Sequence, residues 1–149
     1  MSNLPKRLER LASYFENLDE QSRRERLIAY AEQSSKWQPL ANDEILFKDI
    51  RKDEECLDEV GVFIVRDGES LSYRMQYGKD VQVLTRAMGT ILSEGLNHVQ
   101  PEDVLSIPAG VVHRIIGQQL VRNRSQSIYY IFNRIKQAMK QYLNKVNPG

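Results

Sequence analysis

The sequence contains a single cysteine, Cys56, which excludes any disulfide bond within the chain. One thiol also excludes a zinc ribbon, a CxxC redox pair and an iron–sulfur cluster bound entirely by cysteines of this chain. The two histidines, His98 and His113, are too few for a multi-histidine metal site. We therefore predict no resident metal and no bound cofactor, and a thiol that is kept in a reducing compartment.

Long apolar runs are also absent. The longest are about four residues, such as Val62–Val65, whereas a membrane-spanning helix needs roughly 20. The N-terminal residues MSNLPKRLERL lack the apolar core of a secretory signal. These features predict a soluble, cytoplasmic protein that does not contact membranes. A length of 149 residues with 41% apolar content predicts one domain over residues 1–149.

The net charge is only +1, but the charges are unevenly distributed along the chain. Residues 1–103 hold 14 basic and all 20 acidic residues, a net −6, whereas residues 104–149 carry +7. The basic residues of this second part are Arg114, Arg122, Arg124, Arg134, Lys136, Lys140 and Lys145. Two interpretations remain open: this part packs against an acidic face of its own domain, or it is a docking surface for an acidic partner. No nucleic-acid-binding motif accompanies it, so we expect no nucleic-acid partner.

Apolar spacing predicts two helices near the N-terminus. Leucines at positions 4, 8, 11 and 18, together with Phe15, form one stripe of an amphipathic helix. A second helix is predicted as far as about Ser35, with Leu27, Ile28 and Ala31 facing inward. A proline and an Asn-Asp pair indicate a loop over residues 36–43, and a strand is predicted over 44–50.

The clearest local signal is a β-hairpin. Residues 60–65 are rich in strand-forming side chains, and Asp67-Gly68 is a strong two-residue turn signal. In residues 70–77, apolar side chains at positions 71, 73 and 75 alternate with polar ones at 72, 74 and 76. This alternation predicts a second strand with one buried face and one solvated face.

Helical spacing returns after the hairpin. From about Lys79, apolar residues at positions 81, 84, 88, 91 and 92 share a face, and Gly95 is a fitting stop. Short helices are predicted at 101–103 and 111–116, and a last helix from near Arg124 with an apolar stripe at 128, 131, 132, 135, 139 and 142. The predicted fold class is α+β: a small antiparallel sheet of about three strands, packed with N- and C-terminal helices.

Cys56 lies in the segment RKDEECLDEVGVF, just before the first strand of the hairpin. Its neighbours are mostly charged, which indicates an exposed loop. A free cysteine is more often a small buried apolar residue, so a structural and a functional role are both open on local sequence alone. Carboxylates at positions 53, 54, 55, 58 and 59 oppose thiolate formation unless a cation from elsewhere in the chain lies near.

Four segments resemble those of the SufE-type sulfur acceptors, the partners of cysteine desulfurases in iron–sulfur cluster assembly. The Arg-Ser-Gln run at 124–126 resembles the segment that opens the last helix of that family. Asp80 resembles the acidic residue that opens its central helix. Cys56, with Val60 four residues later, resembles its cysteine loop. The residues QPEDV at 100–104 resemble its T-P-E-D-I turn.

The resemblance covers about residues 8–140 and implies a SufE/IscU-like fold and a sulfur acceptor that activates a desulfurase rather than a stand-alone enzyme. It implies that Cys56 accepts persulfide sulfur, that Arg124 stabilises the resulting anion and that Asp80 belongs to the site, so the three segments should lie together. The partner desulfurase would carry pyridoxal phosphate, and an iron–sulfur scaffold protein would be a further partner. On local sequence alone, Arg124 as a surface residue and Asp80 as a helix-start acid remain open.

Three residues of the cysteine segment depart from the family pattern. Glu55 stands where the family usually has glycine, Asp58 where it has serine, and Gly61 where it commonly has tryptophan. These departures favour an alternative function: a degenerate SufE-like binding or regulatory module that does not accept sulfur.

Overall fold

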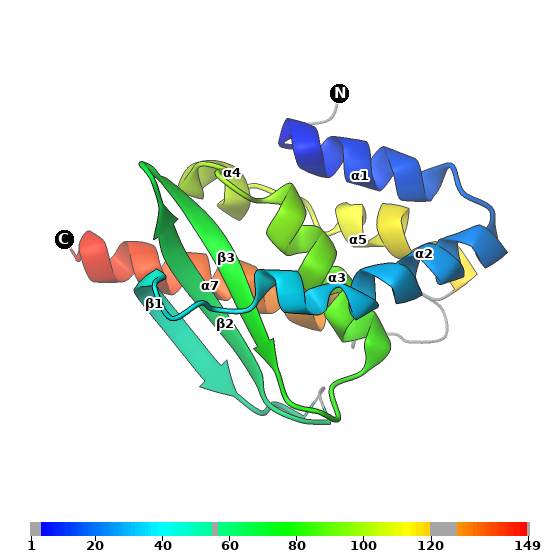
Figure 1. Ribbon diagram of the computed structural model, residues 1–149. Coiled ribbons are helices and arrows are strands. Elements are labelled where there is room, and N and C mark those ends of the chain that lie inside the picture. The colour runs from blue at the N-terminus through cyan, green and yellow to red at the C-terminus, as the bar shows by residue number, and fades with distance from the viewer. Residues whose placement is uncertain (1–3, 55–56, 120–127, 149) are drawn as a thin grey trace.

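Three antiparallel strands form one sheet in the order β1-β2-β3, built from β1 (Glu44–Arg51), β2 (Val60–Asp67) and β3 (Ser70–Tyr77). The structure is a computed structural model, and it describes residues 4–54, 57–119 and 128–148. Helices in these ranges are α1 (Lys6–Glu16), α2 (Glu20–Glu32), the 3₁₀ helix η1 (Ser34–Trp37), α3 (Val83–Gly95), α4 (Pro101–Leu105), α5 (Gly110–Ile116) and α7 (Tyr130–Val146). Figure 1 shows α7 behind the sheet and α1, α2 and α5 gathered around α3. The predicted α+β fold is confirmed.

The predicted hairpin is confirmed, with its turn displaced by one residue. β2 and β3 pair so that Val62 faces Met75. Asp67 is the last paired residue of β2, and the two connecting residues are Gly68 and Glu69 rather than Asp67 and Gly68. Gly68 has a φ of 65°, a left-handed conformation that glycine adopts at little cost because it has no Cβ.

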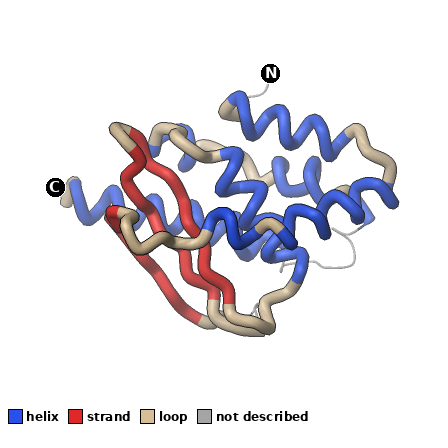
Figure 2. The backbone as a smooth tube through the Cα atoms, viewed as in Figure 1, coloured by secondary structure: helices blue, strands red, loops and turns tan. Residues whose placement is uncertain are grey.

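One face of the sheet is fully covered and the other is covered in part. On one face, the side chains at positions 73 and 75 are fully buried against the helices, as the alternation predicts. On the other face, the prediction of a solvated surface holds at Gln76, which is exposed, but is wrong at Ser72, which is completely buried, and at Arg74, which is half-buried. The chain between η1 and β1 crosses in front of this face (Figure 2). Arg74 stacks 5.6 Å from the Trp37 ring and lies 3.4 Å from the Asp43 carboxylate.

The helices α1 and α2 pack on α3 through the predicted apolar stripes, with one exception. Leu8 and Phe15 of α1 are fully buried, and Leu27 and Ala31 of α2 are buried as well. Ile28, for which the sequence predicts an inward orientation, is 51% exposed. Positions 27 and 31 share one face of α2, whereas position 28 lies about 100° further round the helix. The face of α2 that packs on α3 therefore does not include Ile28.

The central helix begins later than predicted. α3 starts at Val83, and Asp80 lies in a turn before it. The carbonyl of Gly78 accepts hydrogen bonds from the Val81 N–H at 3.2 Å and from the Arg86 guanidinium at 2.6 Å, which hold the chain in this turn. Asp80 is therefore not a first-turn residue of α3, contrary to the prediction.

The last helix, α7, begins at Tyr130, later than the predicted onset near Arg124, and residues 120–127 lie outside the described residues. Its apolar stripe is buried as predicted: Ile131, Ile135 and Met139 are each at most 1% exposed. Among the helices that the structure describes, none has the length and apolar character that crossing a bilayer requires.

Basic residues of the C-terminal part pair with acidic residues of the same chain. The Arg114 guanidinium lies 2.6 Å from the Glu9 carboxylate and 3.1 Å from the Glu16 carboxylate. Arg134 lies within 4 Å of two further carboxylates. For these two arginines, packing against acidic groups of the same domain is confirmed. The arginines at 122 and 124 lie outside the described residues.

Gly95, the last residue of α3, allows α1 to approach closely. A Cβ added there would lie 3.2 Å from the Leu8 Cα and 2.8 Å from its Cδ1. Gly95→Ala should therefore lower the free energy of unfolding by about 1–3 kcal/mol through overpacking, as measured by urea denaturation. Gly110→Ala is the matched control, because a Cβ there meets nothing within 4 Å, and it should stabilise by about 0.4–1 kcal/mol. Equal stability of the two variants would contradict this account of the packing.

Candidate functional site

The cysteine loop, defined here as residues 52–59, connects β1 to β2. Cys56 and the residue before it lie outside the described residues, and so does Arg124. The nearest described residues on either side, Glu54 and Leu57, are exposed, Leu57 to 62%. Because the strands are antiparallel, the end of β1, the start of β2 and the end of β3 meet at one edge of the sheet (Figure 1). The loop therefore adjoins the turn that carries Asp80.

Asp53 holds the first half of the cysteine loop against α7. Its carboxylate accepts hydrogen bonds from the Tyr130 hydroxyl at 2.8 Å and from the Arg51 guanidinium at 3.0 Å. Partial burial raises the pKa of Asp53, but the Tyr130 hydroxyl and two neighbouring guanidinium groups outweigh this effect and bring it below its ordinary value. Burial and the bond to Asp53 raise the pKa of Tyr130 to about 12. At neutral pH the pair is thus a carboxylate and a neutral donor.

Arg134 joins both ends of the loop to α7 and is only 2% exposed. Its guanidinium donates to the backbone carbonyls of Asp49 and Val60, each at 2.8 Å, and to the Tyr130 hydroxyl. The same group lies 3.6 Å from the Asp49 carboxylate and 3.7 Å from the Asp53 carboxylate. Because Asp49 precedes the loop and Val60 follows it, one side chain fixes the distance between the two ends.

Asp58 holds the second half of the loop against the turn before α3. Its carboxylate accepts the backbone N–H of Asp80 at 3.1 Å and that of Glu59 at 2.7 Å. These two hydrogen bonds, the one from Asp80 first, lower the pKa of Asp58. Gly78 makes room for this contact, because a Cβ there would collide with the Asp58 carboxyl group. A negative charge is therefore fixed two residues from Cys56.

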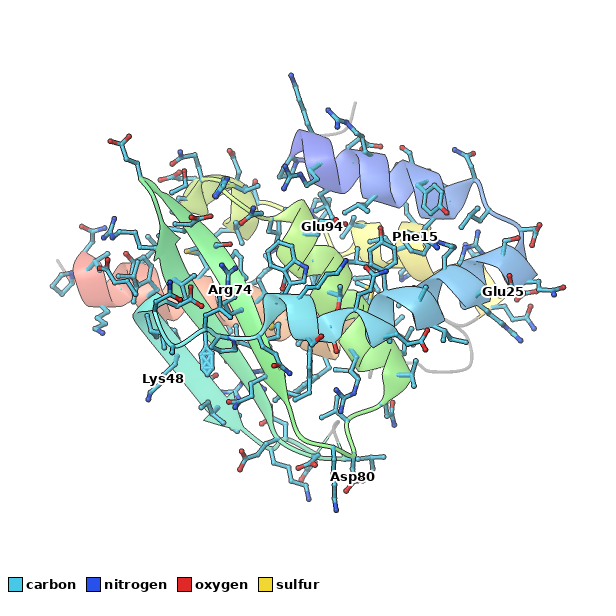
Figure 3. The ribbon with its side chains drawn as sticks, in the orientation of Figure 1. Phe15, Glu25, Lys48, Arg74, Asp80 and Glu94 are labelled. Atoms are coloured by element: carbon cyan, nitrogen blue, oxygen red, sulfur yellow. The ribbon has the colours of Figure 1, made fainter. Side chains whose placement is uncertain are left out.

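Asp80 contributes its backbone to this contact, while its side chain is exposed at the edge of the sheet (Figure 3). The structure thus brings the Asp80 turn and the cysteine loop together, as expected. It also brings the described start of α7 to the loop, through Tyr130 and Arg134. The predicted approach of Arg124 to Cys56 concerns residues that the structure does not describe.

Sequence patterns do not single out Arg134, although a signal is present. Arg134 lies inside the apolar stripe of α7, between the buried Ile131 and Ile135 and four residues after Tyr130. A cation within a buried stripe needs buried acceptors, because an unpaired charge in the interior is costly. The helix sequence cannot identify them, since the Asp49 carbonyl that accepts from Arg134 is 85 residues away along the chain.

The two histidines contact groups outside the cysteine loop. Nε2 of His98 lies 2.7 Å from the carboxylate of Asp67, at the hairpin end of the sheet. His113 of α5 hydrogen-bonds the Tyr129 hydroxyl. Within the ranges that the structure describes, no three His, Cys, Asp or Glu side chains are grouped as metal ligands would be.

Arg134→Met removes the guanidinium that donates to the Asp49 and Val60 carbonyls and pairs with the Asp49 and Asp53 carboxylates at 3.6 and 3.7 Å. Removing one partner of a buried ion pair costs about 3–5 kcal/mol, so we expect a loss of this size in the free energy of unfolding, measured by chemical denaturation. Lys140→Met, at an exposed position of the same helix, should change it by less than about 0.5 kcal/mol. If both variants unfold at the same denaturant concentration, Arg134 does not anchor the loop.

No protein-family model matches the sequence, and a search of curated proteins finds no significant match. Among solved structures, the chain is similar to the solution structure of a hypothetical protein from Thermus thermophilus. The similarity covers 95% of this chain and 98% of that one, with a TM-score of 0.69 and 19% sequence identity. At this identity the likeness shows a shared fold across nearly the whole of both chains.

Proposed function

We propose that this protein is a SufE-type sulfur acceptor that takes persulfide sulfur from a cysteine desulfurase onto Cys56. The observation that carries the proposal is the anchoring of the cysteine loop at both ends to segments that resemble that family. Asp53 is bound to the start of α7, shortly after the Arg-Ser-Gln run, and Asp58 is bound to Asp80. Glu54 and Leu57, between these anchors, face solvent. A loop held in this way can present a thiol to a partner without rearrangement of the fold.

The proposed reaction is a thiol–persulfide exchange. The Cys56 thiolate attacks the outer sulfur of the persulfide on the desulfurase cysteine. The sulfur–sulfur bond of that persulfide breaks, and its electron pair leaves with the desulfurase cysteine as a thiolate. Cys56 then carries the persulfide. One sulfur–sulfur bond forms as one breaks, so the transfer needs no external oxidant or reductant.

Two other residues receive roles in this proposal. Arg124 supplies the positive charge that favours the Cys56 thiolate and its persulfide anion over their protonated forms. Asp80 is a positioning residue, because it is its backbone N–H that binds the loop at Asp58. The chain itself carries no cofactor: pyridoxal phosphate belongs to the desulfurase. An iron–sulfur scaffold protein receives the sulfur, and the reduced thiol requires a cytoplasmic location.

One observation favours the alternative of a regulatory module that does not accept sulfur. The carboxylate of Asp58 is held by two N–H groups, which lower its pKa, so its negative charge is permanent at neutral pH. A fixed negative charge near Cys56 raises the pKa of the thiol and reduces the thiolate fraction. The two functions therefore differ in whether the positive charge of Arg124 lowers the pKa of the Cys56 thiol by more than the negative charge of Asp58 raises it.

Cys56→Ser should abolish sulfur acceptance, because a hydroxyl group cannot form a persulfide. We expect the wild type, incubated with a cysteine desulfurase, pyridoxal phosphate and cysteine, to gain about 32 Da, the mass of one sulfur atom. With one cysteine in the chain, the modified residue is unambiguous. The Cys56→Ser variant should show no gain and no stimulation of the desulfurase, with an unchanged circular dichroism spectrum. A wild type that binds the desulfurase and gains no mass would support the regulatory module instead.

Asp58→Asn tests the electrostatic effect while it retains the contact with the Asp80 turn. Asparagine keeps one oxygen that accepts the Asp80 N–H, loses the acceptor of the Glu59 N–H and carries no charge. Removing a charge that interacts with the thiolate by about 0.5–1 kcal/mol should raise the rate of iodoacetamide labelling of Cys56 near neutral pH about 2- to 5-fold. Glu44→Gln, at the far end of β1, is the control and should leave the rate unchanged. An unaltered rate in Asp58→Asn would show that Asp58 does not control the thiol.

A further inference from the structure

A second candidate site lies where α1, α2 and the end of α3 meet. It is a groove of about 360 Å³, referred to below as the arginine–tyrosine groove. Its polar and aromatic lining consists of Arg7, Arg10, Tyr14, Arg26, Tyr30 and Glu94. Glu94 and Asp80 lie toward opposite ends of α3 (Figure 3). The groove is therefore separate from the cysteine loop.

Helical spacing accounts for the convergence of these side chains. Arg7, Arg10 and Tyr14 are spaced by three and four residues, so they share one face of α1. Arg26 and Tyr30 are four residues apart and share one face of α2. The two faces meet at the groove, because both helices pack on α3.

The two tyrosine rings that line the groove hold the guanidinium of Arg26 in place. The Arg26 guanidinium lies 5.7 Å from the centre of the Tyr30 ring and 6.0 Å from that of Tyr14, both within cation–π range. The rings of Tyr14 and Tyr30 in turn pack against the buried Phe15, at 5.4 and 5.6 Å between centres. The Tyr30 hydroxyl also lies 3.5 Å from the Glu94 carboxylate. The recognition surface is thus formed before any ligand arrives.

The charge of the groove selects an acidic ligand. Three guanidinium groups face one carboxylate, that of Glu94. Arg7 and Arg10 are exposed, and within the described part of the chain neither forms an ion pair. Two free planar guanidinium groups on adjacent turns of a helix suit bidentate binding of carboxylates.

We propose that the arginine–tyrosine groove binds an acidic peptide segment of a partner protein, with carboxylates on Arg7 and Arg10 and an apolar side chain against Tyr14. Arginine and tyrosine, together with tryptophan, are enriched among the residues that contribute most to protein–protein binding energy. Tyr14 is 44% exposed, which leaves its ring free for such a contact. The groove volume is close to the lower limit of about 300 Å³ for small-molecule sites, which favours a peptide lying across two helices. This proposal does not depend on sulfur acceptance at Cys56.

The test uses a short fluorescent peptide of alternating aspartate and glutamate with one central phenylalanine. Its binding is followed by fluorescence polarisation at about 50 mM NaCl, where surface charges are weakly screened. Arg7→Glu combined with Arg10→Glu should weaken binding at least about tenfold, because both carboxylate partners are lost. Arg24→Glu combined with Lys48→Glu is the control. It changes the net charge equally at exposed positions outside the groove and should alter Kd by less than about twofold.

Further measurements distinguish a specific binding site from general electrostatic attraction. Tyr14→Ala, and a peptide with glycine in place of phenylalanine, should each weaken binding about 3- to 10-fold. If the double glutamate variant does not fold, Arg7→Gln combined with Arg10→Gln replaces it. The proposal would be overturned if the control variant weakened peptide binding equally. It would also be overturned if inorganic phosphate, at a concentration equal to that of the peptide, displaced the peptide. Cys56→Ser should bind the peptide as the wild type does, so failure of the proposed function would leave this result intact.

Discussion

The buried guanidinium of Arg134 is the interaction on which the arrangement of sheet, last helix and cysteine loop depends. It donates to a carbonyl at the end of β1 and to one at the start of β2, and it lies beside the carboxylates of Asp49 and Asp53. A charge that is 2% exposed is tolerated only with this set of acceptors. Apart from the Tyr130 hydroxyl of α7, each acceptor belongs to the loop or its flanks. The position of α7 and the separation of the loop ends are therefore set together.

The cysteine loop is thus held by two different kinds of contact. The Asp53 carboxylate pairs with two guanidinium groups, which compensate its charge, and it accepts a hydrogen bond from the Tyr130 hydroxyl. At Asp58, the hydrogen bonds that come from described residues are donated by backbone N–H groups, and Lys52 and Lys79 attract the carboxylate without an ion pair within the described part of the chain. The first contact is a structural anchor. The second combines an anchor with an electrostatic penalty on any thiolate nearby, and this penalty is the point on which the two proposed functions differ.

The central helix separates two surfaces with different chemistry. Before its first residue lies the turn that binds Asp58, next to an acidic loop with one thiol. Near its last residue lies the arginine–tyrosine groove, where Arg26 is stacked on two rings. Because α3 is packed on both the sheet and α7, the two surfaces belong to one rigid core.

Local sequence determined the helices, the hairpin and the α+β class, because each depends on side chains within a few positions of one another. Resemblance to a family placed the Asp80 segment beside the cysteine loop, as the structure does. Tertiary structure alone decided the burial of Ser72, the exposure of Ile28 and the partners of Arg134. Each of these depends on which distant segment covers a face. η1 and its connection to β1 cover Ser72 on β3, α3 covers only one side of α2, and β1 packs against α7 beside Arg134. A periodic pattern shows that a residue needs a partner, but only the folded chain brings that partner within contact distance.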